Sequence, residues 1–132
     1  IWNENLPKVL YVMLNPSLAN DSKDDRTIRR LNYFTKKFGF GGFYVGNIYP
    51  QITPYPKVLY NLNLSHSKKN YFHIDSMVKK SEKTVFAWGN CKEKTVWIEN
   101  LVKAPLCFGK NKNGSPKHPL YLPKDTPLIK FL

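Results

Sequence analysis

Three polar side chains that could bind a ligand stand next to apolar stretches of this sequence: Asn15, Asn47 and His118. An asparagine amide offers two hydrogen-bond donors and an acceptor, and a histidine changes its protonation near neutral pH. Asn15 follows an apolar run and precedes Pro16, and a residue before proline favours an extended backbone. We therefore expect Asn15 to end a buried strand at the rim of a pocket, with Pro16 and Ser17 beside it. A turn that only closes the strand is the alternative, and the two are equally supported.

The other candidate residues also follow predicted strands. Asn47 lies at the end of the second, Gly89 directly after the third, and His118 with Pro119 in the segment after the fourth. In open α/β sheets, ligands bind beyond the carboxyl ends of the strands. These residues and Asn15 should therefore surround one cleft. The structural alternatives are a simple strand end at Asn47 and an ordinary surface turn at His118.

The elements that must position these residues alternate between strand and helix patterns. Apolar runs bounded by turn-forming residues predict strands at 8–14, 43–48, 84–88 and 105–108. Apolar residues at helical spacing predict helices at 24–38, 61–79 and 92–102. Strands that alternate with helices predict an α/β fold, a three-layer sandwich with a central, mainly parallel four-stranded sheet.

Positive charge dominates the chain, with 21 Lys and Arg against 9 Asp and Glu and a net charge of +12. Such an excess favours a polyanionic partner, and we expect nucleic acid, with DNA as the first candidate. A lysine-rich surface without any such partner is the alternative. The residues expected to hold the nucleic-acid backbone are Arg26, Arg29, Arg30 and Lys117.

Length and residue usage limit the class of protein. The 132 residues predict one domain over 1–132, and because the chain starts at Ile1 rather than at a methionine, we expect a truncated N-terminus. Two cysteines, Cys91 and Cys107, are too few for a disulfide framework, and no apolar run could span a membrane. We expect a monomeric, cytoplasmic protein without a membrane partner. Its three histidines lack the spacing of metal ligands, so we expect no metal and no other cofactor.

The segment from Gly109 onward is rich in proline, glycine and lysine. This composition predicts that it lies outside the core and is either disordered or functional. We interpret 109–124 as a functional loop around His118-Pro119. Tyr121 or Leu120 could then insert into a duplex once a base is flipped out.

Several short motifs carry a resemblance to a known family. In chain order they are Met13-Leu14-Asn15-Pro16-Ser17, Asp24-Asp25 with Thr27-Ile28-Arg29-Arg30, Asn47, Ala87-Trp88-Gly89, and Gly114-Ser115-Pro116 with His118-Pro119-Leu120-Tyr121-Leu122. Over nearly the whole chain the sequence resembles the bacterial and phage family known as domain of unknown function 1643. The name of that family implies no activity.

A more distant resemblance suggests an activity. An Asn-Pro at the first strand end, an Asn at the second, a Gly at the third and a His-Pro after the fourth are similar to the uracil-DNA glycosylase superfamily. The resemblance implies a uracil-DNA glycosylase-like fold in which Asn15 positions the attacking water and Asn47 reads a flipped base. It also implies that the His118-Pro119 loop enters the minor groove and contacts a base oxygen.

The resemblance makes Asn15 and His118 the expected catalytic residues of a DNA glycosylase-like hydrolase that excises a flipped, modified or mismatched base. The expected substrate-binding residues are Pro16, Ser17, Asn47, Gly89, Pro119 and Tyr121. Departures from the superfamily motifs occur at Met13, Ser17 and Leu120-Tyr121, so the substrate need not be uracil itself. Two alternatives stay open: a non-catalytic nucleic-acid-binding module, and a hydrolase or transferase that acts on free nucleosides or nucleotides.

Overall fold

The computed structural model describes residues 3–13, 21–48, 64–89 and 96–131, and the side chains of 21–25, 64–70, 96 and 121 lie outside that description. The central strand of its sheet is β1 (Lys8–Met13), in which every residue after Lys8 is buried. Such a continuous apolar run is typical of a parallel strand that is covered on both faces. β1 pairs in parallel with β2 (Gly42–Asn47) on one side and with β3 (Lys83–Phe86) on the other.

The sheet has five strands in the order β2-β1-β3-β4-β5. β4 (Leu106–Cys107) is parallel to β3, whereas β5 (Ile129–Lys130) pairs with β4 in the antiparallel direction. The prediction of an α/β fold is confirmed, but the predicted count of four strands is wrong because β5 closes the outer edge. Both residues of β5 are exposed, so this short strand has no apolar alternation from which it could be predicted.

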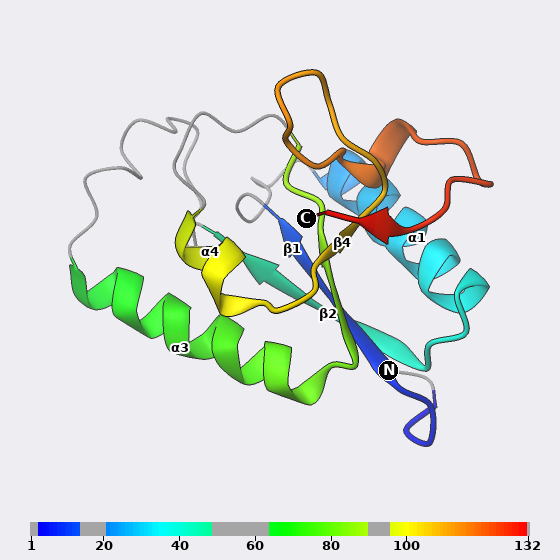
Figure 1. Ribbon diagram of the computed structural model, residues 1–132. Coiled ribbons are helices and arrows are strands. Elements are labelled where there is room, and N and C mark those ends of the chain that lie inside the picture. The colour runs from blue at the N-terminus through cyan, green and yellow to red at the C-terminus, as the bar shows by residue number, and fades with distance from the viewer. Residues whose placement is uncertain (1–2, 14–20, 49–63, 90–95, 132) are drawn as a thin grey trace.

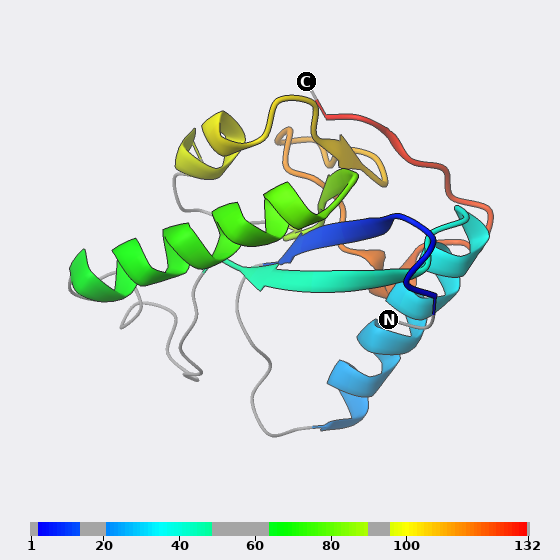
Figure 2. The same ribbon diagram turned by 90° about the horizontal axis from the view of Figure 1, so that it is seen from below.

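Helices cover both faces of the sheet (Figure 1). Figure 2 shows α1 (Asp21–Lys37) on one side, with α3 (Leu64–Lys80) and α4 (Val96–Leu101) on the other. Side chains of β1 alternate between these layers: Tyr11 belongs to the core cluster under α1, and Leu10 and Val12 belong to the cluster under α3. No helix in the described ranges is long and apolar enough to cross a membrane.

The helix α1 begins at Asp21, earlier than the predicted residue 24, and ends as the sequence predicts. Gly39 adopts a φ of +85°, the left-handed conformation that commonly ends a helix. Its N–H donates to the Lys36 carbonyl at 3.1 Å, and Phe38 N–H donates to the Phe34 carbonyl at 2.9 Å. The basic residues Lys36 and Lys37 occupy the last turn, where the helix dipole favours positive charge.

A buried hydrogen-bonded pair fastens α1 to the central strand. The Tyr11 hydroxyl lies 2.9 Å from Thr35 Oγ1, and Thr35 donates its own proton to the Leu31 carbonyl at 2.6 Å. Because Thr35 has a single hydroxyl proton, Tyr11 must be the donor in the first bond. Burial raises the pKa of Tyr11 from 10.0 to about 12.

The C-terminal segment contributes to the core, which contradicts the prediction that residues from Gly109 onward lie outside it. Leu120 and Phe131 are buried, and the Phe131 ring packs against Phe86 and Trp88 at centroid distances of 5.2 and 6.1 Å. The prediction failed because average composition hides single apolar residues that pack individually. Trp88 itself is buried in the same cluster, which agrees with a core role rather than an exposed stacking role.

Candidate functional site

The carboxyl ends of β1, β2 and β3 meet at one edge of the sheet. Met13 at the end of β1 is in register with Asn47 at the end of β2, and Ile48 N–H donates to the Met13 carbonyl at 2.9 Å. On the other side, Ala87 N–H donates to the Val12 carbonyl at 2.9 Å. After β1 the chain builds β2 on one side and then returns to build β3 on the other. The carboxyl ends of β1 and β3 therefore form the topological switch point of the sheet, where open α/β folds bind ligands.

Two of the predicted site residues meet at this edge. Gly89 has a φ of +75° and its N–H donates to the Pro116 carbonyl at 3.0 Å. A Cβ added at Gly89 would lie only 3.3 Å from His118 Cβ, so the absence of a side chain allows the segment 116–118 to approach the end of β3. The geometry thus brings Gly89 and His118 together from positions far apart in the sequence.

The first predicted motif cannot be placed in the same way. Asn15, Pro16 and Ser17 lie outside the described residues, so their predicted roles stay predictions. Asn47 ends β2 and is partly buried. Asn47 is paired in register with Met13, and Met13 precedes Asn15 by two positions in the chain.

His118 is the N-cap of a short 3-10 helix, η1 (Pro119–Tyr121), with Pro119 in its first turn. The His118 Nδ1 atom accepts a hydrogen bond from Leu120 N–H at 3.2 Å. In the neutral imidazole this places the proton on Nε2, which becomes the donor nitrogen. Pro119 is buried, which favours a structural role in starting the turn over a direct contact with substrate. The side chain of Tyr121 lies outside the described set.

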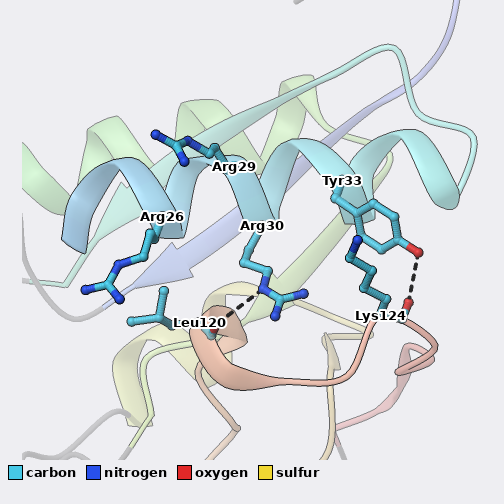
Figure 3. A pocket seen from close by; sticks show the side chains of 6 residues that line it. All are labelled: Arg26, Arg29, Arg30, Tyr33, Leu120 and Lys124. Atoms are coloured by element: carbon cyan, nitrogen blue, oxygen red, sulfur yellow. Dashed lines mark hydrogen bonds between the residues drawn. The ribbon is translucent and has the colours of Figure 1, made fainter. Parts of the chain in front are cut away.

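A pocket of about 440 Å³ lies beside this edge, between α1 and the segment that follows His118 (Figure 3). We call it the arginine pocket, and its six lining residues are Arg26, Arg29, Arg30, Tyr33, Leu120 and Lys124. In Figure 3, Arg26 and Arg30 extend toward η1, whereas Arg29 extends from the other edge of the helix. The sequence predicted the three arginines as backbone-binding residues, and the structure gathers them in one place.

Hydrogen bonds hold the wall of the arginine pocket against α1. Arg30 Nε donates to the Leu120 carbonyl at 3.2 Å, and the Tyr33 hydroxyl donates to the Lys124 carbonyl at 3.3 Å. Lys37 Nζ donates to the same carbonyl at 2.6 Å, and Lys124 Nζ lies 5.5 Å from the centroid of the Tyr33 ring. Since Leu120 also donates to His118, the pocket and the predicted catalytic histidine are joined through one residue.

Sequence reasoning missed Tyr33 and Lys124 as pocket residues. A signal existed for Tyr33, because Arg26, Arg30 and Tyr33 recur at intervals of four and three residues and so share a helix face. The sequence gives no such signal for Lys124, because this residue reaches the pocket only through the path of the C-terminal segment.

The fourth predicted backbone-binding residue, Lys117, is not among the residues that line the arginine pocket. Its N–H donates to the Gly109 carbonyl at 2.9 Å, next to a bridge between Lys110 and Pro116. The aliphatic part of Lys117 lies close to Gly109, where an added Cβ would be 3.5 Å from Lys117 Cδ. The segment from 109 to 117 is therefore an ordered turn.

A second pocket, of about 350 Å³, lies at the opposite, amino edge of the sheet. We call it the mixed-charge pocket, because Asp75 and Glu82 line it together with Lys79, Lys83 and Lys103. Lys79 Nζ forms an ion pair with Asp75 at 3.0 Å. Within the described residues, no group of three or more His, Cys, Asp and Glu side chains could hold a metal ion.

Comparison with known proteins identifies a family. A family model described as "Protein of unknown function (DUF1643)" matches residues 1–120 of the chain. No curated protein and no solved structure matches it. The first resemblance seen in the sequence is thereby confirmed, and the resemblance to uracil-DNA glycosylases stays a prediction.

Proposed function

We propose that this chain, which belongs to the DUF1643 family of proteins of unknown function, binds nucleic acid and excises a base from it. The substrate is a flipped, modified or mismatched base, DNA is the first candidate for the nucleic acid, and the reaction is hydrolysis of the N-glycosidic bond. One observation carries the proposal: the arginine pocket adjoins the segment that holds His118 against Gly89 at the switch point. A flipped base is captured only if its flanking phosphates are held near the site that receives it.

The proposed reaction requires few catalytic groups. Cleavage of a glycosidic C–N bond passes through an oxocarbenium-like sugar and a base that leaves as an anion, so a held water and a donor to the departing base suffice. In this proposal Asn15 holds the water, as its resemblance to the superfamily motif implies. His118 donates from Nε2 to a base oxygen, because its Nδ1 accepts from Leu120. Asn47 has the donor and acceptor groups that a base edge requires.

The proposal is tested with a panel of oligonucleotides that carry modified or mismatched bases, followed by alkali cleavage at abasic sites. We expect cleavage at one or more of these bases with the wild-type protein, none with Asn15→Ala, and unchanged cleavage with Lys103→Gln in the mixed-charge pocket. Thermal melting checks that the variants fold. Cleavage by Asn15→Ala at the wild-type rate would contradict the water-holding role.

Binding without cleavage at any base would overturn the enzymatic half of the proposal and leave a nucleic-acid-binding module. Release of bases from free nucleosides or nucleotides, but not from oligonucleotides, would overturn the nucleic-acid half. Strong dependence of oligonucleotide affinity on salt separates these two outcomes, because phosphate contacts release counterions.

A further inference from the structure

All the arginines of this chain lie in a single pocket. The sequence contains three arginines, Arg26, Arg29 and Arg30. All the other residues in its total of 21 Lys and Arg are lysines. All three line the arginine pocket, together with Lys124. A lysine-rich surface needs only charge, which either residue supplies. Arginine adds a planar fork of donors that matches a phosphate group, so its confinement to one pocket points to phosphate recognition.

Two of the three arginines, Arg26 and Arg30, are positioned to share one anion. Arg26 and Arg30 are one helical turn apart on α1, a spacing at which side chains are neighbours. The Nε of Arg30 is used by the Leu120 carbonyl. A guanidinium has five N–H groups, so the terminal nitrogens of Arg30 can still donate to a ligand while Nε holds Leu120. None of the six lining residues that the structure describes is acidic.

The arginine pocket is larger than a phosphate group alone requires, and part of its wall is apolar. Its volume of about 440 Å³ lies within the range of small-molecule sites, roughly 300–1,000 Å³. Two of its walls carry apolar surface, the partly exposed ring of Tyr33 and the small part of the Leu120 side chain that is not buried (Figure 3). A nucleoside presents an aromatic base that packs on such walls, and stacking of bases on tyrosine recurs in single-strand binding sites.

We propose that the arginine pocket binds one nucleotide unit, with its phosphate between Arg26 and Arg30 and its base or sugar against Tyr33 and Leu120. The ligand is a nucleoside phosphate, either a unit of a strand or a free nucleotide. The inference rests on the proposed function in taking the strand as the natural source. In that case the pocket holds the nucleotide next to the one at the switch point, and Arg30 joins the two positions through Leu120 and His118.

Backbone NMR titration with four ligands tests this site directly: a deoxynucleoside 5′-monophosphate, the same nucleoside without phosphate, inorganic phosphate, and a single-stranded trinucleotide. We expect the monophosphate to shift the amide signals of Arg26, Arg30 and Leu120 and to leave those of Lys83 and Lys103 unmoved. The nucleoside and inorganic phosphate should each bind at least about tenfold more weakly, because each lacks one half of the contacts. The trinucleotide should bind more tightly than the monophosphate if a strand is the source, and no more tightly if a free nucleotide is.

Conservative substitutions separate arginine recognition from charge alone. Arg26→Lys keeps the charge but removes the fork, and we expect a loss of affinity of about tenfold, the cost of one charge-assisted hydrogen bond. Among the side chains that the structure describes, Arg26 forms no hydrogen bond or ion pair, whereas Arg30 holds the Leu120 carbonyl, so this variant should fold as the wild type does. Lys83→Arg is the matched control and should leave affinity unchanged.

Three results would overturn the inference: no shift at the pocket with any of the ligands, equal affinity for inorganic phosphate and the monophosphate, or full affinity in Arg26→Lys. These results do not depend on base release. Pocket binding without base excision would leave the inference standing and contradict the proposed reaction. Excision by a protein whose pocket fails this titration would contradict the inference alone.

Discussion

The two pockets described above have similar sizes but differ in charge balance: one is lined by cations and the other by charges of both signs. The arginine pocket, beside the carboxyl ends of the strands, presents four cations among its six described lining residues and no carboxylate. The mixed-charge pocket at the amino edge sets Asp75 and Glu82 beside three lysines, and one of those lysines is paired with Asp75. A net charge of +12 is thus compatible with both a balanced surface and an unbalanced one. Local balance and the choice of arginine, rather than total charge, separate a candidate anion site from ordinary surface.

The two pockets also differ in the polar contacts that border them. The helix of the arginine pocket, α1, is fastened to β1 by the buried pair of Tyr11 and Thr35, and to the C-terminal segment by Arg30, Tyr33 and Lys37. The mixed-charge pocket is bordered by an ion pair in which the Lys79 side chain is 76% exposed. A site that must hold a ligand in fixed geometry benefits from rigid support. The comparison therefore predicts large effects on one side of the molecule and small ones on the other.

Among the described residues, the largest expected effect is on base release in His118→Ala. Loss of the donor to the departing base should lower the single-turnover rate by about 10²–10³-fold, as when one oxyanion-type donor is removed. Nucleic-acid affinity should change little, because phosphate contacts supply most of it. A quench assay for abasic sites gives the rate, and Glu82→Gln in the mixed-charge pocket is the control. Full activity in His118→Ala would remove the link between the arginine pocket and the chemistry.

Alkaline pH should destabilise the fold through Tyr11, a buried residue that contacts α1. The folded-state pKa of Tyr11 is raised from 10.0 to about 12, so the neutral phenol is favoured in the folded state. The contribution of this pKa difference to the free energy of unfolding is complete below pH 10. It is lost as the pH rises from 10 through 12, by at most about 3 kcal/mol. Urea denaturation of the wild type and of Tyr11→Phe, at pH 9 and pH 11.5, isolates this part. Equal pH dependence in the two proteins would show that burial does not raise the pKa of Tyr11 in the folded state.

A smaller effect is expected at the contact between Gly89 and His118. Gly89→Ala introduces a Cβ at a φ of +75° and 3.3 Å from His118 Cβ. The left-handed backbone alone should lower the free energy of unfolding by about 1 kcal/mol, and the close approach adds to that. Gly114→Ala is the matched control, because its φ is +87° with nothing within 4 Å of the added Cβ. Chemical denaturation compares them, and equal losses would mean that the approach of His118 costs nothing.

The smallest effect is expected in the mixed-charge pocket. Asp75→Asn removes the ion pair with Lys79, and a pair this exposed contributes under about 0.5 kcal/mol. Thermal melting at low and high salt should therefore hardly distinguish the variant from the wild type. A loss comparable to that in Gly89→Ala would show that this side of the molecule is as strongly supported as the other, and the comparison would fail.

Much of the fold could be predicted because its signals are local. β1 is an apolar run because both of its faces are buried, and α1 has apolar residues at helical spacing because one of its faces is buried. Both elements are found where expected. The fifth strand and the buried Phe131 were missed, because their partners β4 and Phe86 lie far away in the sequence. Pairing at such separation depends on tertiary packing rather than on local pattern.

The candidate site divides in the same way. The sequence predicted that Gly89 and His118 would lie together, because strand ends of a parallel sheet share an edge. It also singled out the three arginines, but it grouped them with Lys117, which lies in a separate turn. Lys124 was missed because only the path of the C-terminal segment over α1 brings it to the pocket. Asn15 lies outside the described residues and stays a prediction.

The central claim is that nucleic acid binds at the arginine pocket, and the salt dependence of DNA binding tests it most directly. The measurement compares wild type, the double variant Arg26→Gln/Arg30→Gln and the double variant Lys83→Gln/Lys103→Gln, which remove equal charge from the two pockets. Each lost phosphate contact lowers the slope of log affinity against log salt by about 0.9 on duplex DNA. Because Arg26 and Arg30 share one phosphate, we predict a slope reduced by about 0.9 in the arginine variant and an unchanged slope in the lysine variant. Equal reductions in both variants, or none in the arginine variant, would contradict the claim.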